Sequence, residues 1–162
     1  MPARADERNG CSMKIAIGND HAAVDLKFHV AKYLESKGYE VIDLGIKTPE
    51  RCDYPVFGQR VGQAVVNGEA DYGVVICGTG IGISIAANKV DGVRCALCSE
   101  PVSARLAREH NNANIVAMGA RTVGPAMAEA IVDVFLTTDF LGGRHAHRVD
   151  MFGRIEKGEI VG

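Results

Sequence analysis

The sequence predicts an α/β domain of the three-layer, doubly wound (Rossmann-like) kind, with a five-stranded parallel sheet, helices on both faces and a short C-terminal helix. Two observations lead to this prediction. Five short apolar runs alternate with segments of helical periodicity, and the runs are nearly continuous, as in strands buried on both faces. At 162 residues, 47% of them hydrophobic, the chain is long enough for one well-cored domain.

The first half of the chain contains three strand and helix units. Apolar runs that we expect to be strands occupy residues 13–18, 40–45 and 71–77. Apolar side chains at helical spacing follow each run, at residues 22–36, 55–67 and 83–88. Gly38 and Gly68 come directly after the first two helical segments, and glycine is the residue that most often ends a helix.

Two more units follow in the second half. Strands are expected at residues 93–97 and 114–119, and helices at residues 101–110 and 125–136. Ser99 is the expected cap of the first of these helices, with Pro101 in its first turn, and Gly124 precedes the proline that opens the second. A polar segment at residues 142–148 leads to the last short helix.

Residues 1–12 are polar and lack periodicity, so we expect a disordered N-terminal extension before a single domain at residues 13–162. A net charge of −2 and a pI near 6.2 do not favour nucleic acid as a partner, because such proteins usually carry a clustered basic excess. No apolar run approaches the roughly 20 residues of a membrane span, and the N-terminus lacks the apolar core of a signal peptide. We expect a cytoplasmic protein without a membrane partner.

The five cysteines form an odd set without a framework spacing, which indicates reduced thiols. Cys95 and Cys98 have the CxxC spacing of metal and redox sites. They fall in an expected strand, however, where residues three apart face opposite sides, and no second CxxC accompanies them. We expect no metal site there.

Residues 74–88 carry the strongest functional signal. An apolar strand ends in Cys77 and passes through three alternate glycines and Thr79 into a helix. Such a turn leaves backbone N–H groups unpaired at a helix N-terminus, where they can bind an anion or a developing oxyanion. Thr79 has no apolar surface to pack and offers its hydroxyl to a ligand. Cys77 is either a reactive thiol beside this site or the last small residue of a buried strand.

Polar residues also follow the other strands. Ligands of parallel sheets bind at the carboxyl ends of the strands, near the point where strand order reverses. The residues at these ends are Asp20 and His21 after the first strand, Asp53 and Tyr54 after the second, Ser99 and Glu100 after the fourth, and Arg121 after the fifth. Acid, imidazole, thiol and guanidinium at one edge favour an active site, although a helix cap would explain Asp20 and a solvated turn would explain His21.

Two further segments have competing interpretations. Arg144 and Arg148 share one face if their segment is helical, and paired arginines suit a phosphate, but a solvated basic tail would also explain them. The histidines between them have no carboxylate or cysteine at a matching spacing to complete a metal site. His110 and Asn111 close a helix and so belong at the sheet edge opposite Cys77. They either cap that helix or enter the site of a second subunit.

Seven segments, ordered along residues 13–156, resemble the ribose-5-phosphate isomerase B family, which also includes subunits of galactose-6-phosphate isomerase. They are Gly18-Asn19-Asp20-His21, Asp53-Tyr54-Pro55, Ile76-Cys77-Gly78-Thr79-Gly80-Ile81-Gly82-Ile83-Ser84, Cys98-Ser99-Glu100-Pro101, Glu109-His110-Asn111, Met118-Gly119-Ala120-Arg121 and Gly142-Gly143-Arg144-His145. The resemblance implies a cofactor-free aldose–ketose isomerase of phosphorylated sugars. It also implies a homodimer, or a tetramer, with active sites shared between subunits, which favours the second-subunit interpretation of His110.

The resemblance implies residue roles as well. Cys77 is similar to the family's base, which moves a proton between C1 and C2 through an enediolate without a metal, although some members use another base. His110 is similar to the residue that opens the furanose ring, with Asp20 assisting. Thr79 is grouped with these catalytic residues. The implied sugar contacts are Tyr54, Gly78, Gly80, Ile81, Gly82 and Asn111. The implied phosphate contacts are His21, Arg121, Arg144 and Arg148.

Alternatives to ribose 5-phosphate as the substrate, and to an isomerase, stay open on sequence. Allose 6-phosphate or galactose 6-phosphate differs by one hydroxymethylene group, which residues 47–54 could select without a visible motif. The glycines at 78, 80 and 82, with Glu100 further on, loosely imitate a nucleotide- or dinucleotide-binding fingerprint, but they follow the third strand and are spaced GxGxG. A flavodoxin-like electron carrier is disfavoured because the chain has no Trp and few aromatic residues.

Overall fold

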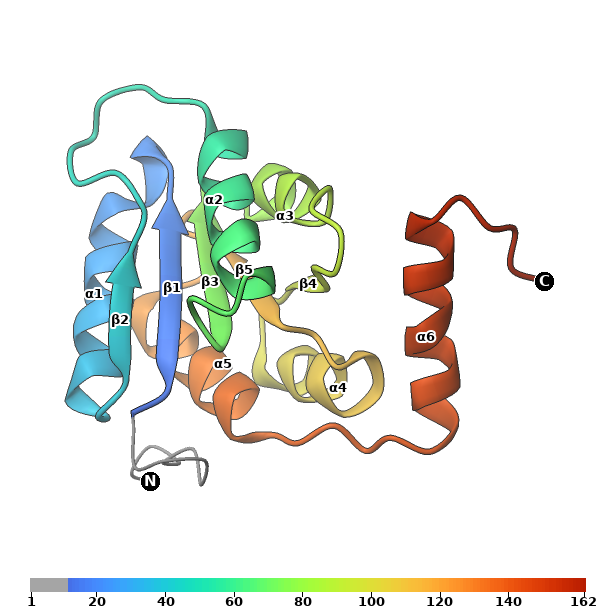
Figure 1. Ribbon diagram of the computed structural model, residues 1–162. Helices are drawn as coiled ribbons and strands as arrows, with labels where there is room; N and C mark the ends of the chain where they lie inside the picture. Colours follow the sequence, from blue (N-terminus) through green and yellow to red (C-terminus); the bar gives the residue numbers. More distant parts are fainter. Residues whose placement is uncertain (1–11) are drawn as a thin grey trace.

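The computed structural model describes residues 12–162 and contains one five-stranded parallel sheet (Figure 1). The strands are β1 (Lys14–Asn19), β2 (Glu40–Asp43), β3 (Tyr72–Cys77), β4 (Cys95–Leu97) and β5 (Ile115–Gly119). They lie in the order β2-β1-β3-β5-β4, and every neighbouring pair is parallel. Most of the expected N-terminal extension, residues 1–11, lies outside the described residues.

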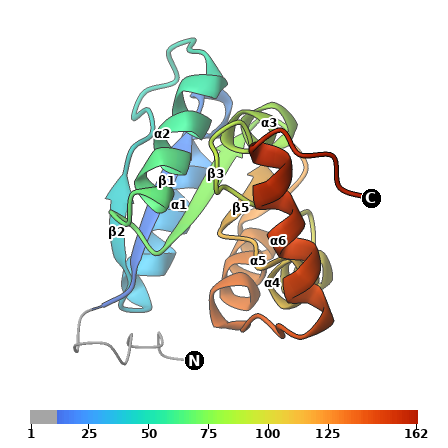
Figure 2. The same ribbon diagram turned by 45° about the vertical axis from the view of Figure 1, so that its right-hand side comes forward.

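Helices cover both faces of the sheet (Figures 1 and 2). They are the short 3-10 helix η1 (His21–Ala23) and the α-helices α1 (Val24–Ser36), α2 (Tyr54–Val66), α3 (Ile81–Ala87), α4 (Pro101–Asn111), α5 (Pro125–Thr137) and α6 (Arg144–Glu156). The predicted doubly wound fold class is therefore confirmed. Within residues 12–162, no helix combines the length and the apolar character needed to cross a membrane.

Two hydrophobic cores fill the spaces between the sheet and its helices. Side chains alternate along each strand, so that Ile17 faces α1 and α5 while its neighbour Ala16 faces α2. Cys77 belongs to the second core, with Phe57 of α2 and Ile83 of α3. The last residue of β3 is thus held against the two helices whose N-termini open at the carboxyl edge of the sheet.

The strand order places the reversal point of the sheet between β1 and β3. The chain passes from β1 outward to β2 and then returns to β3 on the other side of β1. Loops after β1 and β3 therefore diverge at the carboxyl edge, which is where open α/β sheets bind ligands. Because β5 is the other neighbour of β3, the loop after β5 meets the same place.

The start of α4 differs from the prediction. Glu100, and not Ser99, is the N-cap, since its carboxylate accepts the backbone N–H groups of Val102 at 2.5 Å and Ser103 at 2.8 Å. Pro101 is the first helical residue, which leaves Ser99 one position too early to cap. Glu100 is therefore engaged in capping α4.

The C-terminal helix α6 includes the basic segment instead of following it. It begins at Arg144 and runs for 13 residues, as long as α1, α2 and α5. Figures 1 and 2 show α6 beside α4 and apart from the sheet and its helix layers. Two hydrogen bonds, one just before α6 and one at its last residue, are among the contacts that tie it to the body. The N–H of Leu141 donates to the carbonyl of Glu109 at 3.1 Å, and the N–H of Gly92 donates to Glu156 Oε1 at 2.8 Å.

Two cations lie in the interior where the apolar pattern gave no sign of them. Lys27 of α1 is fully buried, and its Nζ lies 2.6 Å from Asp43 Oδ2 at the end of β2. Arg108 of α4 is also buried and donates to the hydroxyl of Tyr72 at 2.9 Å. A buried cation is costly unless it is paired or fully hydrogen-bonded. Lys27 meets a carboxylate and Arg108 meets neutral oxygens, and these contacts fix both helices against the sheet.

Candidate active site

The loop between β3 and α3 brings a backbone N–H onto the thiol of Cys77. Gly80 has a φ of +77°, in the left-handed region, and its N–H donates to Cys77 Sγ at 3.1 Å. The N–H of Ile81 points at Thr79 Oγ1 over 3.4 Å as α3 begins. The loop therefore directs a backbone donor at the sulfur atom that borders the cavity described below.

The loop is held in place by the segment that follows β5. The N–H groups of Ala120 and Arg121 donate to the carbonyls of Cys77 and Gly78, both at 2.9 Å. Gly119 has no side chain and lies directly under the loop, where a Cβ would come within 2.5 Å of the Thr79 carbonyl carbon. Gly119 thus permits the close approach, and the two hydrogen bonds fix it.

The exit of β1 supplies a carboxylate and an imidazole. Asp20 is 6% exposed, its N–H donates to the carbonyl of Ile76, and its Oδ1 accepts the N–H of Ala22 at 3.0 Å. His21 follows as the first residue of η1, and its Nδ1 lies 3.4 Å from the N–H of Cys52 in the loop after β2. The Cys52 N–H leaves the other ring nitrogen of His21 available to a ligand.

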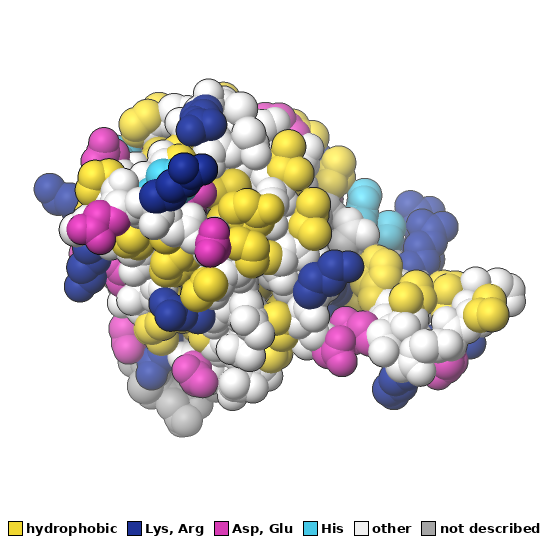
Figure 3. All heavy atoms as spheres, turned by 90° about the horizontal axis from the view of Figure 1, so that it is seen from above, with side chains coloured by type: hydrophobic (Ala, Val, Ile, Leu, Met, Phe, Trp, Pro, Cys, Tyr) yellow, Lys and Arg dark blue, Asp and Glu magenta, His cyan; other side chains and the backbone are white. Residues whose placement is uncertain are grey.

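These residues line one open cavity of about 510 Å³ at the carboxyl edge. Its lining comprises Asp20, His21, Ala22, Tyr54, Cys77, Gly78, Thr79, Ile81, Gly82, Ile85 and Arg121. The ring of Tyr54 packs against Gly82, where a Cβ would meet it at 2.5 Å, and the guanidinium of Arg121 lies over Gly78. Figure 3 looks onto this side of the molecule and shows hydrophobic side chains gathered near its middle, with charged groups around them.

Chemically, the cavity combines a group that can take a proton with groups that can hold negative charge. A thiol that accepts an N–H can act as a base, and the backbone of a glycine loop at the start of α3 can stabilise a developing oxyanion. Arg121 is the one cation of the lining and Asp20 its one carboxylate. Within residues 12–162, no three His, Cys, Asp or Glu side chains are grouped so that they could hold a metal ion.

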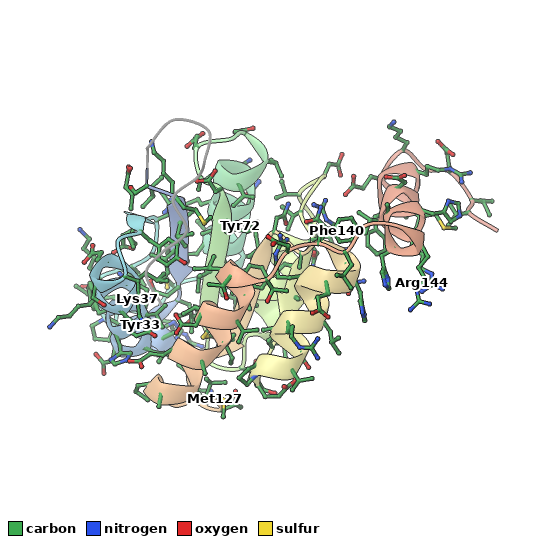
Figure 4. The ribbon with its side chains drawn as sticks, turned by 90° about the horizontal axis from the view of Figure 1, so that it is seen from below. Tyr33, Lys37, Tyr72, Met127, Phe140 and Arg144 are labelled. Atoms are coloured by element: carbon green, nitrogen blue, oxygen red, sulfur yellow. The ribbon has the colours of Figure 1, made fainter. Side chains whose placement is uncertain are left out.

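Four of the predicted site residues lie elsewhere in the same chain. They are His110, Asn111, Arg144 and Arg148. His110 stacks on His145, with ring centroids 4.3 Å apart and planes 9° apart, and Asn111 lines a separate groove of about 420 Å³ beside Phe152 of α6. Arg144 stands on α6, away from the sheet (Figure 4). One chain therefore brings together the thiol half of the predicted site but not its His110 half.

The CxxC segment is unsuited to reactive chemistry. Cys95 packs on the side of α2 and α3, whereas Cys98 belongs to the opposite core, so the predicted opposition of the two thiols is confirmed. Burial raises the pKa of the Cys98 thiol to about 11, with a contribution from Glu100, and burial also raises the pKa of Cys95. Both thiols are therefore protonated near neutral pH.

Comparison with known proteins decides the family. The sequence model of the family described as Ribose/Galactose Isomerase matches residues 15–152. The chain belongs to this family. The resemblance inferred from the seven segments is therefore confirmed.

Individual relatives within the Ribose/Galactose Isomerase family agree. Ribose-5-phosphate isomerase B of Escherichia coli is 49% identical over 144 residues, which are 89% of this chain and 97% of that protein. A solved structure of ribose-5-phosphate isomerase B from Clostridium thermocellum superposes with a TM-score of 0.89 at 55% identity, covering 90% of this chain and 99% of that one. The galactose-6-phosphate isomerase subunit LacB of Clostridium acetobutylicum is 48% identical over 79% of this chain and 74% of its own length.

Membership of the Ribose/Galactose Isomerase family does not favour the nucleotide-binding and flavodoxin-like alternatives. The cavity also contains two residues that sequence reasoning missed, Ala22 and Ile85. Ile85 is an exposed apolar residue one turn after Ile81, which is exposed as well. The spacing of these two isoleucines on one face of the helix was the available signal. No pattern in the sequence predicted that His145 contacts His110, because the two residues are 35 positions apart.

Replacing Gly80 by alanine tests the loop geometry. A Cβ at Gly80 would lie 2.7 Å from the Met118 carbonyl carbon, and the left-handed φ adds strain. Gly68 is a matched control because its φ of +76° is the same and nothing lies within 4 Å of its Cβ position. We expect Gly68→Ala to cost about 1–2 kcal/mol of unfolding free energy and Gly80→Ala about 1–3 kcal/mol more. Equal costs in urea denaturation would contradict a tightly packed loop.

Proposed function

We propose that this protein is an isomerase that interconverts ribose 5-phosphate and ribulose 5-phosphate by proton transfer through an enediolate. The observation that carries the proposal is the Gly80 N–H donated to Cys77 Sγ inside the cavity, in a chain of the Ribose/Galactose Isomerase family. The thiolate of Cys77 takes the proton from C2 of the open-chain aldose, and the C1 carbonyl oxygen gains the negative charge of the enediolate. The proton of the C2 hydroxyl then passes to O1, and the Cys77 thiol returns its proton to C1, which leaves a carbonyl at C2 and gives the ketose.

The glycine loop stabilises the enediolate. Removing a proton beside a carbonyl places charge on oxygen, and fixed backbone donors at that point lower the barrier without needing to reorganise. Gly78 and Gly82 line the cavity at the start of α3 and offer backbone donors there, while the N–H groups of Gly80 and Ile81 hold Cys77 Sγ and Thr79 Oγ1. Thr79 adds a hydroxyl. No cofactor is needed for this chemistry in our proposal, because the charge is taken up by backbone dipoles.

Ring opening requires a second proton-transfer group. Ribose 5-phosphate is mainly a furanose, so its C1 hydroxyl must lose a proton and its ring oxygen must gain one before C2 becomes acidic. We assign this step to His110, with Asp20 assisting and Asn111 contacting sugar oxygens. Since His110 does not line the cavity of its own chain, the proposal places it in the cavity of a second copy.

The phosphate is held by groups from both copies in this proposal. His21 and Arg121 line the cavity, but one arginine beside one carboxylate leaves a phosphate dianion poorly neutralised. Arg144 and Arg148 stand on α6, outside the sheet layers, and would supply two forked donors to the partner's cavity.

We accordingly propose a homodimer with shared sites, on which a tetramer can be built. α6 stands apart from the body, and apolar side chains are exposed both on it and beside the cavity. They include Phe152 and Ile155 on α6 and Ile81, Ile85 and Leu97 near the carboxyl edge. Residues 13–162 would act as one sugar-phosphate isomerase domain in the cytoplasm.

A six-carbon substrate is the second candidate. The 48% identity to a galactose-6-phosphate isomerase subunit favours testing it, and the β2–α2 loop up to Tyr54 borders the cavity where an extra hydroxymethylene would lie. We prefer ribose 5-phosphate because the E. coli and C. thermocellum relatives, which align over nearly their whole length, are ribose-5-phosphate isomerases B.

The base and the substrate are tested together. With wild-type protein, we expect kcat/KM for ribose 5-phosphate to exceed the values for allose 6-phosphate and galactose 6-phosphate by about tenfold or more, because the cavity must accommodate their extra hydroxymethylene group. Equal or higher values for a six-carbon substrate would contradict the preference.

Cys77→Ala should lower kcat by about 10³-fold or more, since the base is lost. Cys95→Ala, which removes a thiol outside the cavity, is the control for folding and for cysteine loss. Substantial turnover by folded Cys77→Ala would mean that another group is the base.

The shared site is tested by mixing inactive variants. In a Cys77→Ala homodimer both sites lack the base, and in a His110→Ala homodimer both sites lack the ring-opening group. A mixed dimer contains one site with both wild-type residues, so random exchange should restore about a quarter of wild-type activity. The activity is measured after subunit exchange has been verified by native mass spectrometry. Mixed dimers without activity would place both residues in the site of one chain.

A further inference from the structure

The imidazole rings of His110 and His145 form a parallel stack. Their centroids are 4.3 Å apart and their planes differ by 9°. His110 is the penultimate residue of α4, and His145 is the second residue of α6. Within residues 12–162, His145 is the one side-chain partner of the His110 ring, so both nitrogens of His110 remain available to a ligand.

The backbone around His145 is built to hold this ring in place. Leu141 donates its N–H to the carbonyl of Glu109, the residue before His110, at 3.1 Å. Gly142 and Gly143 then turn the chain with φ values of +61° and +55°, and the N–H of His145 donates to the Gly142 carbonyl at 3.0 Å. The chain therefore approaches α4 beside His110 and starts α6 with one residue directed at it.

The charge state of His145 suits a stacking partner. His145 is 8% exposed, and burial lowers the pKa of its imidazole. His110, Arg144 and Arg148 lower that pKa further, because a positive charge on His145 would be repelled by theirs. A neutral ring can lie face to face with His110 whether or not His110 carries a proton, whereas two stacked cations would repel each other.

We propose that His145 is a positioning residue, whose ring holds the His110 imidazole by stacking in the orientation that ring opening requires. The inference rests on the proposed function of His110 and deepens it. Proton transfer to a sugar oxygen needs the ring nitrogen within hydrogen-bond reach, and the stack on His145 is the one ring contact of His110 among the described residues. His145 supplies that restraint without touching the sugar.

Two rates separate positioning of His110 from a general effect on the protein. Conversion of ribose 5-phosphate requires ring opening. Deuterium exchange from D2O into C1 of ribulose 5-phosphate requires only the base, because a ketose whose C5 oxygen carries the phosphate cannot close a furanose ring. Proton NMR measures the exchange, and a coupled assay measures the conversion.

We expect His145→Ala to lower conversion of ribose 5-phosphate by about tenfold and to leave exchange within about twofold of wild type. His145→Phe should restore most of the conversion, because a phenyl ring can stack as well. His147→Ala, on the exposed side of the same helix turn, should change neither rate. In a His110→Ala background, His145→Ala should have no further effect, since the ring that it positions is gone.

The outcomes separate failure of this inference from failure of the proposed function. If His110→Ala lowers conversion but spares exchange, the ring-opening role stands. In that case, His145→Ala variants that change neither rate, or lower both equally, would overturn the positioning role. Failure of folded His145→Phe to restore conversion would also overturn it. If His110→Ala spares or abolishes both rates alike, the ring-opening role fails and the positioning role fails with it.

Discussion

The hydrogen bond from the Gly80 N–H to Cys77 Sγ is the interaction on which the site depends. It exists only because Gly80 adopts a left-handed φ and because Gly119 lets the loop lie directly on the end of β5. The same contact brings Arg121 over Gly78, so one packing constraint positions the thiol, the backbone donors and a cation together. The sheet serves to place β3 beside β1 and β5, where all three exits converge.

The arrangement of the remaining residues explains why one chain is incomplete in our account. His110 stands at the end of α4 and does not line the cavity of its own chain, and α6 extends beyond the sheet and its helix layers. A second copy would bring the His110 and His145 stack and the α6 arginines to the thiol. Proton transfer at carbon and proton transfer at the ring oxygen would then be divided between two chains, each holding its part rigidly.

Much of the fold could be predicted from sequence. Continuous apolar runs indicate strands that are buried on both faces of a parallel sheet, and glycines mark the residues at which helices end. The cavity residues could also be predicted, because the carboxyl ends of parallel strands lie at one edge of the sheet. Asp20, Cys77 and Arg121 each follow or end a strand there and line the same cavity. Long-range pairings could not be predicted. Lys27 meets Asp43, and His145 meets His110, through packing that no local spacing encodes. Ser99 was wrong as a helix cap, since Pro101 fixes the helix start one residue later and a glutamate can cap as well.

The central claim, that Cys77 is the base in the substrate cavity, is tested most directly by following inactivation against alkylation of each cysteine. Wild-type protein is treated with iodoacetamide, and residual activity is compared with site-resolved modification by mass spectrometry. We expect activity to fall in proportion to modification of Cys77 and ribose 5-phosphate to protect this residue. Cys95 and Cys98 should react slowly because the pKa of each thiol is raised. Full alkylation of Cys77 with activity retained, or inactivation that follows another cysteine, would contradict the claim.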